Sequence, residues 1–396
     1  MANFPVKPLT REHSDFFNAI RALAAFVVLI SHLLSIYLLP RYGLTIASEL
    51  CFFTIPAYAV AIFFILSGFF ITYSALNITK DNQGRFSSRQ FLLNRLTRLY
   101  PPLILSLILI AVIFLFFNHG FENSYSYIPR DAKFSLLNTL SLNLKNYLPN
   151  FFFLQGVFVG KDSLAMNRAL WTLSYEFWYY IIFMLGTVMV INKRYRSSVI
   201  LLLILLGALI YRNQFRFLWL FIIWLSGVFL ALQYNSSKLL QAEYKKVALF
   251  ILIILGLIVM MVYQKNDAFY LIAYLTNTAL FIQVCLSLMI MLLISLALRL
   301  KLDFKNKYYL SLSRSANYSY TLYVIHYPII LFLFRYTWPY IQHWSMITIL
   351  AVMAIDGLVI IYISKKCAII LENKKLFRRM LSRLFNKGDK ALCETN

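Results

Sequence analysis

The sequence predicts an all-α integral membrane protein with about ten transmembrane helices and both termini in the cytoplasm. The chain of 396 residues is 61% hydrophobic and only 13% charged, with a mean hydropathy of +0.71. A soluble globular domain carries about twice that fraction of charged residues. Apolar stretches near the roughly 20 residues that cross a bilayer recur along the whole chain, and short basic connectors separate them.

The apolar stretches define ten predicted spans. They cover residues 17–39, 50–76, 99–117, 169–191, 198–211, 217–234, 247–263, 270–298, 317–334 and 345–364. The fifth span is short and the eighth is long, and a tilt of the helix in the bilayer accommodates both lengths. The predicted organisation is a tail over 1–16, a membrane domain over 17–364 with a long outer connector at 118–168, and a basic tail over 365–396.

The distribution of positive charge predicts the orientation. The net charge of +23 arises mainly from Lys and Arg residues in the two tails and in alternate connectors. Because cytoplasmic connectors are enriched in these residues, both termini are expected in the cytoplasm. Nucleic-acid binding is not expected, since it needs a basic surface on a soluble fold. The basic carboxyl tail is interpreted as an amphipathic helix lying on anionic membrane lipid.

Five ionisable residues fall inside the predicted spans: Arg21, His32, Glu176, His326 and Asp356. Such groups are costly in hydrocarbon and usually face a cavity or a partner. Arg21 and His32 are eleven positions apart, so they share one helix face at a separation of roughly 16 Å. This pair is therefore a functional candidate. Asp356 is interpreted as structural, pairing with a hydroxyl or with Arg335.

The predicted topology places these residues at different depths. The first helix runs outward, so Arg21 lies near its cytoplasmic edge and His32 lies about 10 Å below its outer edge. Glu176, on an inward-running helix, comes out at about the depth of His32, and we expect the two side chains to meet. A histidine can accept a hydroxyl proton near neutral pH, and a carboxylate can orient its ring. The pair suits acyl transfer.

A cluster of arginines marks the predicted inner mouth. Arg95 and Arg98 precede Tyr100, Pro101 and Pro102 and would face the same way on a helix. If the prolines occupy the first turn, the arginines lie at the helix amino end, which favours anions, and their guanidinium forks match phosphate oxygens. Two interpretations stay open: a site for a phosphorylated donor, or ordinary positive-inside arginines.

Three further segments carry polar residues within spans. Ser67 and Gly68 interrupt an apolar run, where close helix packing is the favoured interpretation and contact with a narrow ligand the alternative. Trp171 and Ser174 open the fourth span, and the tryptophan also suits an interfacial belt. His326 lies on a polar helix face before a proline, and it either belongs to the pathway or bonds a neighbouring helix.

These stretches, taken together and in this order, resemble the acyltransferase-3 family of integral membrane O-acyltransferases. The resemblance spans essentially the whole chain. It is carried by Arg21 with His32, by the Ser67–Gly68 segment, and by three further motifs. These are Arg95-Leu-Thr-Arg98-Leu-Tyr-Pro, Trp171-Thr-Leu-Ser-Tyr-Glu176 and Ser319-Tyr-Thr-Leu-Tyr-Val-Ile-His326.

The resemblance implies a function and roles for individual residues. It implies transfer of an acyl group, usually acetyl, from cytoplasmic acyl-CoA to a glycan hydroxyl at the outer side of the membrane. His32 would be the catalytic histidine, and Arg21, Arg95 and Arg98 would bind the donor. Family members commonly carry Asp where this chain has Asn18, so an ion pair with Arg21 is in doubt. Some members add a carboxyl-terminal SGNH-hydrolase-like domain, which we do not expect here.

The expected protein is a bacterial inner-membrane O-acetyltransferase that modifies a cell-surface polysaccharide or a lipid-linked glycan precursor, such as lipopolysaccharide O-antigen or exopolysaccharide. Acetyl-CoA is a co-substrate, and neither a permanently bound cofactor nor a metal is expected. The expected catalytic pair is His32 with Glu176, and Ser67 and Gly68 join the donor arginines. Pathway residues are expected to be Asn18, Tyr100, Trp171, Ser174, Tyr323 and His326.

Two alternatives to an acyltransferase come from other functional classes. Buried ionisable groups also line solute pathways, so a transporter or flippase is the main alternative. A nonenzymatic scaffold for glycan assembly is the other. Within the acyltransferase interpretation, direct transfer and an acyl-histidine intermediate both stay open.

Overall fold

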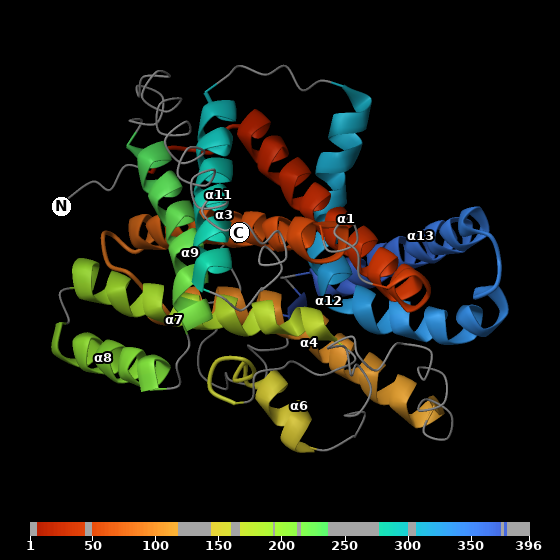
Figure 1. Cartoon of the computed structure of the whole chain (residues 1–396). Helices are drawn as coiled ribbons and strands as arrows, with labels where there is room; N and C mark the ends of the chain where they lie inside the picture. Colours follow the sequence, from red (N-terminus) through yellow and green to blue (C-terminus); the bar gives the residue numbers. More distant parts are fainter. Residues whose placement is uncertain are drawn as a thin grey trace.

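The structure, a computed structural model, describes residues 6–43, 50–117, 144–159, 167–192, 195–211, 215–236, 277–299, 306–373 and 376–377. These residues are helical apart from turns and one isolated bridge between Gln155 and Val159. The α-helices are α1 (Arg11–Tyr42), α3 (Ile55–Asp81), α4 (Ser88–Phe117), α6 (Leu144–Phe151), α7 (Trp171–Asn192), α8 (Tyr195–Tyr211), α9 (Phe215–Asn235), α11 (Asn277–Ala297), α12 (Lys307–Ile341) and α13 (Met346–Leu371) (Figure 1). The all-α fold class is confirmed.

The described helices account for most of the predicted spans. Seven of them are long and apolar enough to cross a membrane. The other two predicted spans with a described helix are α8, which has only 17 residues, and α12, which carries many polar side chains. The predicted span 247–263 lies outside the described residues, as do residues 118–143 of the outer connector and most of the basic tail. The count of ten and the orientation therefore stay predictions.

Helix α4 begins earlier than the sequence predicts. It starts at Ser88, so Pro101 and Pro102 lie inside it and Arg95 and Arg98 are interior residues, not residues at a helix amino end. The expectation of an anion site built on that helix end is wrong. Prolines are tolerated inside membrane helices because neighbouring groups satisfy the carbonyls that they free.

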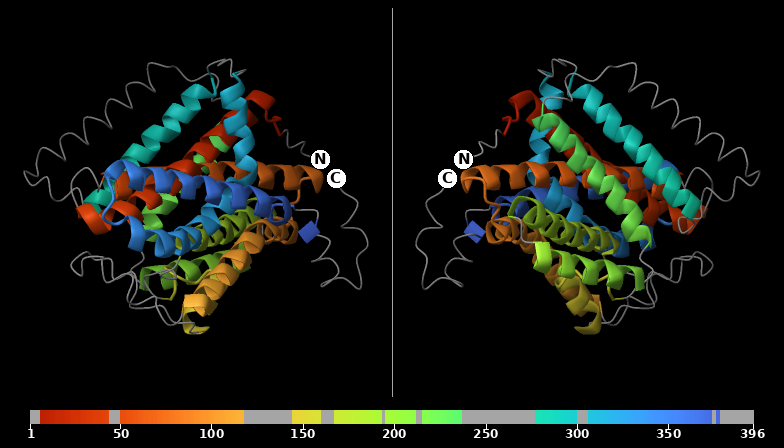
Figure 2. Two further views of the ribbon diagram at one scale, coloured as in Figure 1. Left: turned by 90° about the vertical axis from the view of Figure 1, so that its right-hand side faces the viewer. Right: turned by 90° about the vertical axis from the view of Figure 1, so that its left-hand side faces the viewer.

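The helices pack most extensively as α1 against α12, α3 against α9, and α12 against α13. They cross at a range of angles and do not form a parallel bundle (Figure 2). Two glycines allow the close approach of α3 and α9. A Cβ on Gly68 would lie 2.1 Å from the Trp224 carbonyl oxygen, and a Cβ on Gly227 would lie 1.9 Å from that of Ile65. Gly68 is thus a packing residue, which is the interpretation that the sequence favours, and it is not among the residues that line the narrow cavity described below; its assignment to donor binding stays a prediction.

Helix α12 changes direction along its length (Figure 1). Pro328 lies within the helix and has no N–H, so the carbonyl of Val324 loses its intrahelical donor. The side chain of Asn167 replaces that donor: its Nδ2 lies 2.7 Å from the Val324 oxygen and 2.7 Å from Ser106 Oγ. The segment before α7 is thereby fixed to the bend of α12.

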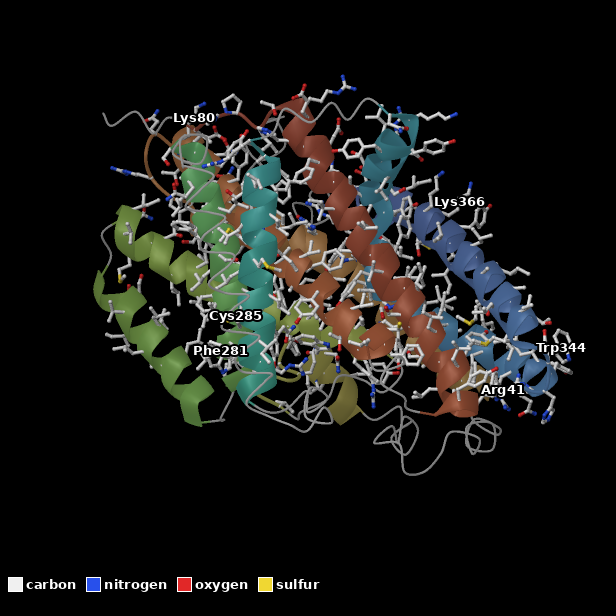
Figure 3. The ribbon with its side chains drawn as sticks, turned by 45° about the horizontal axis from the view of Figure 1, so that its top comes forward. Arg41, Lys80, Phe281, Cys285, Trp344 and Lys366 are labelled. Atoms are coloured by element: carbon white, nitrogen blue, oxygen red, sulfur yellow. The ribbon has the colours of Figure 1, made fainter. Side chains whose placement is uncertain are left out.

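Basic residues predicted on one side of the membrane lie toward one end of the molecule. Lys80 and Lys366 lie toward one end of the helices, and Arg41 and Trp344 lie toward the other (Figure 3). Arg41 Nη1 donates a hydrogen bond to the carbonyl of Trp344 there. The arrangement agrees with a common side for the connector after α3 and the end of α13, while the compartment that each end faces stays a prediction.

Candidate active site

A narrow cavity of about 50 Å³ lies among α1, α3, α4, α7 and α12. Arg21, Arg95 and Arg98 line it together with Ser67 and Glu176. Residues from four helices that are far apart in the sequence, α1, α3, α4 and α7, therefore meet at one place. The remainder of the wall is mainly aromatic and aliphatic, so the charged groups face a small space with little competing polarity.

Glu176 is held by hydroxyl groups within this cavity. Ser67 Oγ donates to Glu176 Oε1 at 2.7 Å, and the hydroxyl of Tyr180 donates to the same oxygen. Trp224 Nε1 donates in turn to Ser67 Oγ at 3.2 Å. Glu176 also interacts electrostatically with Arg21 and Arg98. The carboxylate therefore belongs to the arginine cluster.

The three guanidinium groups of the cavity rest against aromatic faces. Their carbon atoms lie 4.8 Å from the ring centre of Phe70 for Arg21, 5.8 Å from Phe91 for Arg95 and 5.4 Å from Tyr320 for Arg98. Cation–π contacts hold the planar groups while leaving N–H donors directed elsewhere. Arg95 uses one such donor, with Nη2 lying 2.9 Å from Ser74 Oγ.

A wider cleft of about 990 Å³ adjoins the narrow cavity. Arg21, Arg98 and Tyr320 line both spaces and so form their common boundary. The cleft also carries Arg314 and Lys365, from the beginning of α12 and the end of α13. Asn18 lies on its wall as well. The cleft is thus rich in positive charge where it meets the narrow cavity.

Glu372, directly after α13, is the acidic residue lining this cleft. Its Oε1 accepts hydrogen bonds from the backbone N–H of Thr321 at 3.1 Å and from the Thr321 hydroxyl at 2.8 Å. Burial raises the pKa of the Glu372 carboxyl above its ordinary value, although these hydrogen bonds and the charges of Arg98 and Arg21 act in the opposite direction. The sequence had no pattern that marked this residue, because it falls in the predicted tail.

His32 lies against α12. Its ring centre is 5.2 Å from that of His326 and 5.1 Å from that of Tyr327, which meets it edge-on. Tyr323 connects this group to the narrow cavity: it lines the cavity, and its ring centre lies 6.0 Å from that of His326. Arg168, in the 3₁₀ turn Arg168–Leu170 before α7, interacts electrostatically with His32 and Tyr327.

The expected meeting of His32 and Glu176 is not what the structure shows. The described hydrogen bonds of Glu176 go to Ser67 and Tyr180, whereas the ring contacts of His32 are with His326 and Tyr327. Equal depth in the membrane does not bring two side chains together unless their helices are neighbours. Helix α1 packs along α12, which carries His326, while Glu176 on α7 reaches Ser67 on α3.

Four other residues expected along the pathway have different surroundings. Tyr323 lines the narrow cavity, and its hydroxyl lies 2.8 Å from Thr172 Oγ1. Tyr100 contacts the rings of two phenylalanines outside the cavity, at 5.4 and 5.3 Å. The ring centre of Trp171 lies 4.3 Å from the guanidinium carbon of Arg216. Ser174 is buried and lines neither space. Only Tyr323 of these four is part of the cavity wall.

Sequence reasoning missed several wall residues. Tyr180 follows Glu176 by one helical turn, and that spacing was available as an indication. Tyr320 and Arg314 lie on a helix whose polar face was recognised, but their position at the cleft depends on the packing of α12 against α1 and α13.

Asp356 has the structural role that the sequence predicts, since its carboxylate accepts a hydrogen bond from the hydroxyl of Tyr37.

Comparisons with known proteins identify the family of the chain. The model of an acyltransferase domain, that of the acyltransferase-3 family, matches residues 14–364. A relative from Haemophilus influenzae, named only as an uncharacterized protein, is 32% identical over 149 residues, which are 37% of this chain. The match spans about half of that relative, 54% of its length. No solved structure matches the chain. Because the family model covers most of its length, the chain belongs to the acyltransferase-3 family of multi-pass membrane proteins.

Proposed function

We propose that this protein is a membrane O-acyltransferase that moves an acetyl group from acetyl-CoA to a hydroxyl of a cell-surface glycan or a lipid-linked glycan precursor. The observation that carries the proposal is the order of the spaces. A wide basic cleft narrows at Arg21, Arg98 and Tyr320 into a thin cavity, and Tyr323 on its wall leads to His326 and His32. Family membership supplies the reaction class.

The cleft suits the nucleotide end of a CoA thioester. That end carries several phosphate charges, and the cleft is lined by four cationic side chains, Arg21, Arg98, Arg314 and Lys365, against the carboxylate of Glu372. Arginine forks bind phosphate oxygens through paired hydrogen bonds. The donor phosphates would therefore lie in the cleft, with the pantetheine arm directed past Tyr320.

The narrow cavity suits a short acyl chain. A space of about 50 Å³ holds only a few water molecules. An acetyl thioester on a thin arm needs far less movement of the wall than a long acyl chain does. The size of the cavity thus supports acetyl as the transferred group.

His32 is the proposed catalytic base. The acceptor hydroxyl oxygen attacks the thioester carbonyl carbon while its proton passes to a ring nitrogen of His32. The C–S bond then breaks, and the proton passes from His32 to the CoA sulfur, which leaves as the thiol. Glu176 acts at the arginine cluster and not on His32: it keeps the guanidinium groups from repelling one another when no donor is bound.

The acceptor and the location follow from the family resemblance and the predicted topology. The donor would be reached from the cytoplasm, and the acceptor would be a glycan on the outer side of a bacterial inner membrane. The basic tail would lie on membrane lipid. Lipopolysaccharide O-antigen and exopolysaccharide are the proposed acceptor classes.

A gene deletion complemented with variants tests the assignment. The His32→Ala variant should insert normally and leave the surface polysaccharide without the acetyl groups that the wild type adds, as measured by mass spectrometry. The His343→Ala variant is the matched control, because His343 is exposed after α12. Unchanged acetylation in the His32→Ala strain would overturn the assignment.

A second experiment separates an enzyme from a transporter. Purified protein in lipid vesicles is given acetyl-CoA labelled in the acetyl group together with the polysaccharide from the deletion strain. Label is expected in the polysaccharide. Uptake of a solute into the vesicles without any transfer of label would contradict the proposed function and favour a transporter.

A further inference from the structure

Backbone carbonyl groups determine which ring nitrogen of neutral His326 carries the hydrogen. Its Nδ1 lies 2.8 Å from the carbonyl oxygen of Tyr323 and 3.1 Å from that of Leu322. A carbonyl oxygen can only accept a hydrogen bond, so Nδ1 must carry the hydrogen. In the neutral ring, Nε2 is then a bare nitrogen that can only accept.

The bare nitrogen of His326 is buried without a partner in the described part of the chain. The residue is only 1% exposed, and Nε2 has no hydrogen-bond partner there. Buried acceptors are usually satisfied, so a lone one at a candidate catalytic site calls for a donor. The ring of His32 is the nearest ring contact of His326, with centres 5.2 Å apart and planes tilted by 48°.

The hydroxyl of Tyr323, another group near His326, already shares a hydrogen bond with a different residue. The Tyr323 ring centre lies 6.0 Å from that of His326, but the Tyr323 hydroxyl lies 2.8 Å from Thr172 Oγ1 and shares a hydrogen bond with it. Tyr327 meets His326 edge-on at a centre distance of 6.3 Å, farther than His32. An N–H of His32 is therefore the donor best placed to form a hydrogen bond with His326 Nε2.

We propose that His326 is a positioning residue that accepts a hydrogen bond from one ring N–H of His32 and thereby fixes the tautomer of His32. The other ring nitrogen of His32 then keeps its lone pair for the acceptor hydroxyl. This inference rests on the proposed function, because it gives the catalytic base of that reaction its required state. It replaces Glu176, the partner that the sequence predicts, with a second histidine.

The hydrogen bond does more in the transition state than before it. When His32 takes the proton of the acceptor hydroxyl, its ring becomes a cation, and its remaining N–H donates a stronger, charge-assisted bond to His326 Nε2. An interaction that strengthens in the transition state raises kcat and leaves donor binding unchanged. Loss of the acceptor at position 326 should consequently lower kcat without changing KM for acetyl-CoA.

Two variants at position 326 test this with purified protein in lipid. His326→Phe keeps a ring but removes the acceptor and should lower kcat by roughly 10²-fold, the lower end of the range for acid–base groups. His326→Gln keeps an acceptor atom near the place of Nε2 and should recover most of that loss. His343→Phe, the same substitution at an exposed histidine, should match the wild type. Equal kcat in the His326→Phe variant and the wild type would overturn the inference.

Nitrogen NMR gives a readout that does not depend on activity. The chain has five histidines, so ¹⁵N-histidine labelling combined with single variants assigns each ring. In the wild type, we expect His326 with a protonated Nδ1 and bare Nε2, and His32 as a single tautomer. The His326→Phe variant should show His32 as a tautomer mixture. If the wild-type spectrum shows a mixture of His32 tautomers, that result by itself refutes the inference, whether or not the variant folds.

The outcomes separate the two proposals. If His32→Ala retains acetyl transfer, the proposed function fails. If His32→Ala loses transfer while His326→Phe keeps the wild-type kcat, the function stands and only the role of His326 fails.

Discussion

Glu372 shows how a single carboxylate can set the charge of a cleft. It lies on the same wall as Arg21 and Arg98 and interacts electrostatically with both. While it is ionised, it offsets part of the positive charge that the proposed donor phosphates need. Its Thr321 hydrogen bonds hold the carboxylate in place, so this effect is built into the end of α13.

The Glu372→Gln substitution should tighten donor binding at neutral pH. It removes a negative charge that repels phosphate while keeping an oxygen for Thr321, and KM for acetyl-CoA should fall roughly fivefold, as expected for one partly exposed charge. Because burial raises the pKa of Glu372, lowering the pH protonates the wild-type residue. The difference in KM should therefore shrink as the pH falls. A difference that grows toward acid pH would contradict this account.

Protein stability provides an independent readout of the same group. A carboxyl whose pKa is higher in the folded state contributes stability that is present at low pH and is lost as the pH rises through the folded-state pKa. Thermal unfolding of the wild type in detergent should show this loss, and Glu372→Gln should reduce it. Glu12→Gln, at an exposed residue in the first turn of α1, is the matched control.

At the scale of helices, the bend of α12 and the turn before α7 form one unit. Asn167 donates to the carbonyl that Pro328 leaves without a partner, and the same amide bonds Ser106 on α4. The turn that holds Arg168 near His32 is thus attached to the bent helix that carries His326. A change in the bend would therefore move both Arg168 and His326 relative to His32.

A double-mutant cycle tests this unit. Asn167→Ala should lower the free energy of unfolding by about 1–3 kcal/mol, because a buried carbonyl loses its donor. In a Pro328→Ala background the helix regains an N–H for Val324, so the same substitution should cost less. Denaturant unfolding in detergent measures both values. Equal costs in the two backgrounds would show that Asn167 does not serve the Val324 carbonyl.

The contact of α3 with α9 makes a second prediction at this scale. Gly227→Ala places a methyl group against the backbone of Ile65, and the resulting overpacking should destabilise the protein by about 1–3 kcal/mol or more. Gly186→Ala is the matched control: a Cβ there meets nothing within 4 Å, so helix propensity should stabilise that variant by up to about 1 kcal/mol. Similar melting temperatures for the two variants would contradict the close packing.

Helix cores were more predictable from the sequence than helix ends. Long apolar runs identify a membrane helix directly, which is why most predicted spans coincide with described helices. The start of α4 was missed because prolines usually mark a first turn, and here they lie inside the helix. The eight-residue α6 was not predicted, since so short a segment carries too little periodicity.

For the candidate site, the sequence identified side chains better than partners. Arg21, Arg95 and Arg98 were recognised by charge within or beside apolar spans, and they do line one cavity. The partner of His32 was not recognised, because contacts between helices depend on crossing angles and side-chain shapes that no local pattern contains.

At the scale of the whole molecule, the two ends of the helices carry different basic residues. Lys80 and Lys366 lie toward one end, and Arg41 lies toward the other (Figure 3). The predicted orientation places the first end in the cytoplasm. Single cysteines introduced at these positions, in a chain whose four native cysteines are replaced, report the side directly.

A membrane-impermeant thiol reagent should label Arg41→Cys in intact cells. Lys80→Cys and Lys366→Cys should be labelled only after the inner membrane is opened, since both are expected on the cytoplasmic side. Labelling of Lys80→Cys and Lys366→Cys from opposite sides would contradict the structure. Reversal of all three results would contradict only the predicted orientation.

The boundary between the two spaces also bears on the electrical sealing of the membrane. An enzyme with a donor on one side and an acceptor on the other needs a pathway, yet the membrane potential drives protons and other cations along any wet pathway. Arg21, Arg95 and Arg98 surround about 50 Å³ of space, and fixed positive charge in a narrow constriction repels cations. If the donor binds there as proposed, the same cluster would also oppose the leakage of cations when no donor is bound.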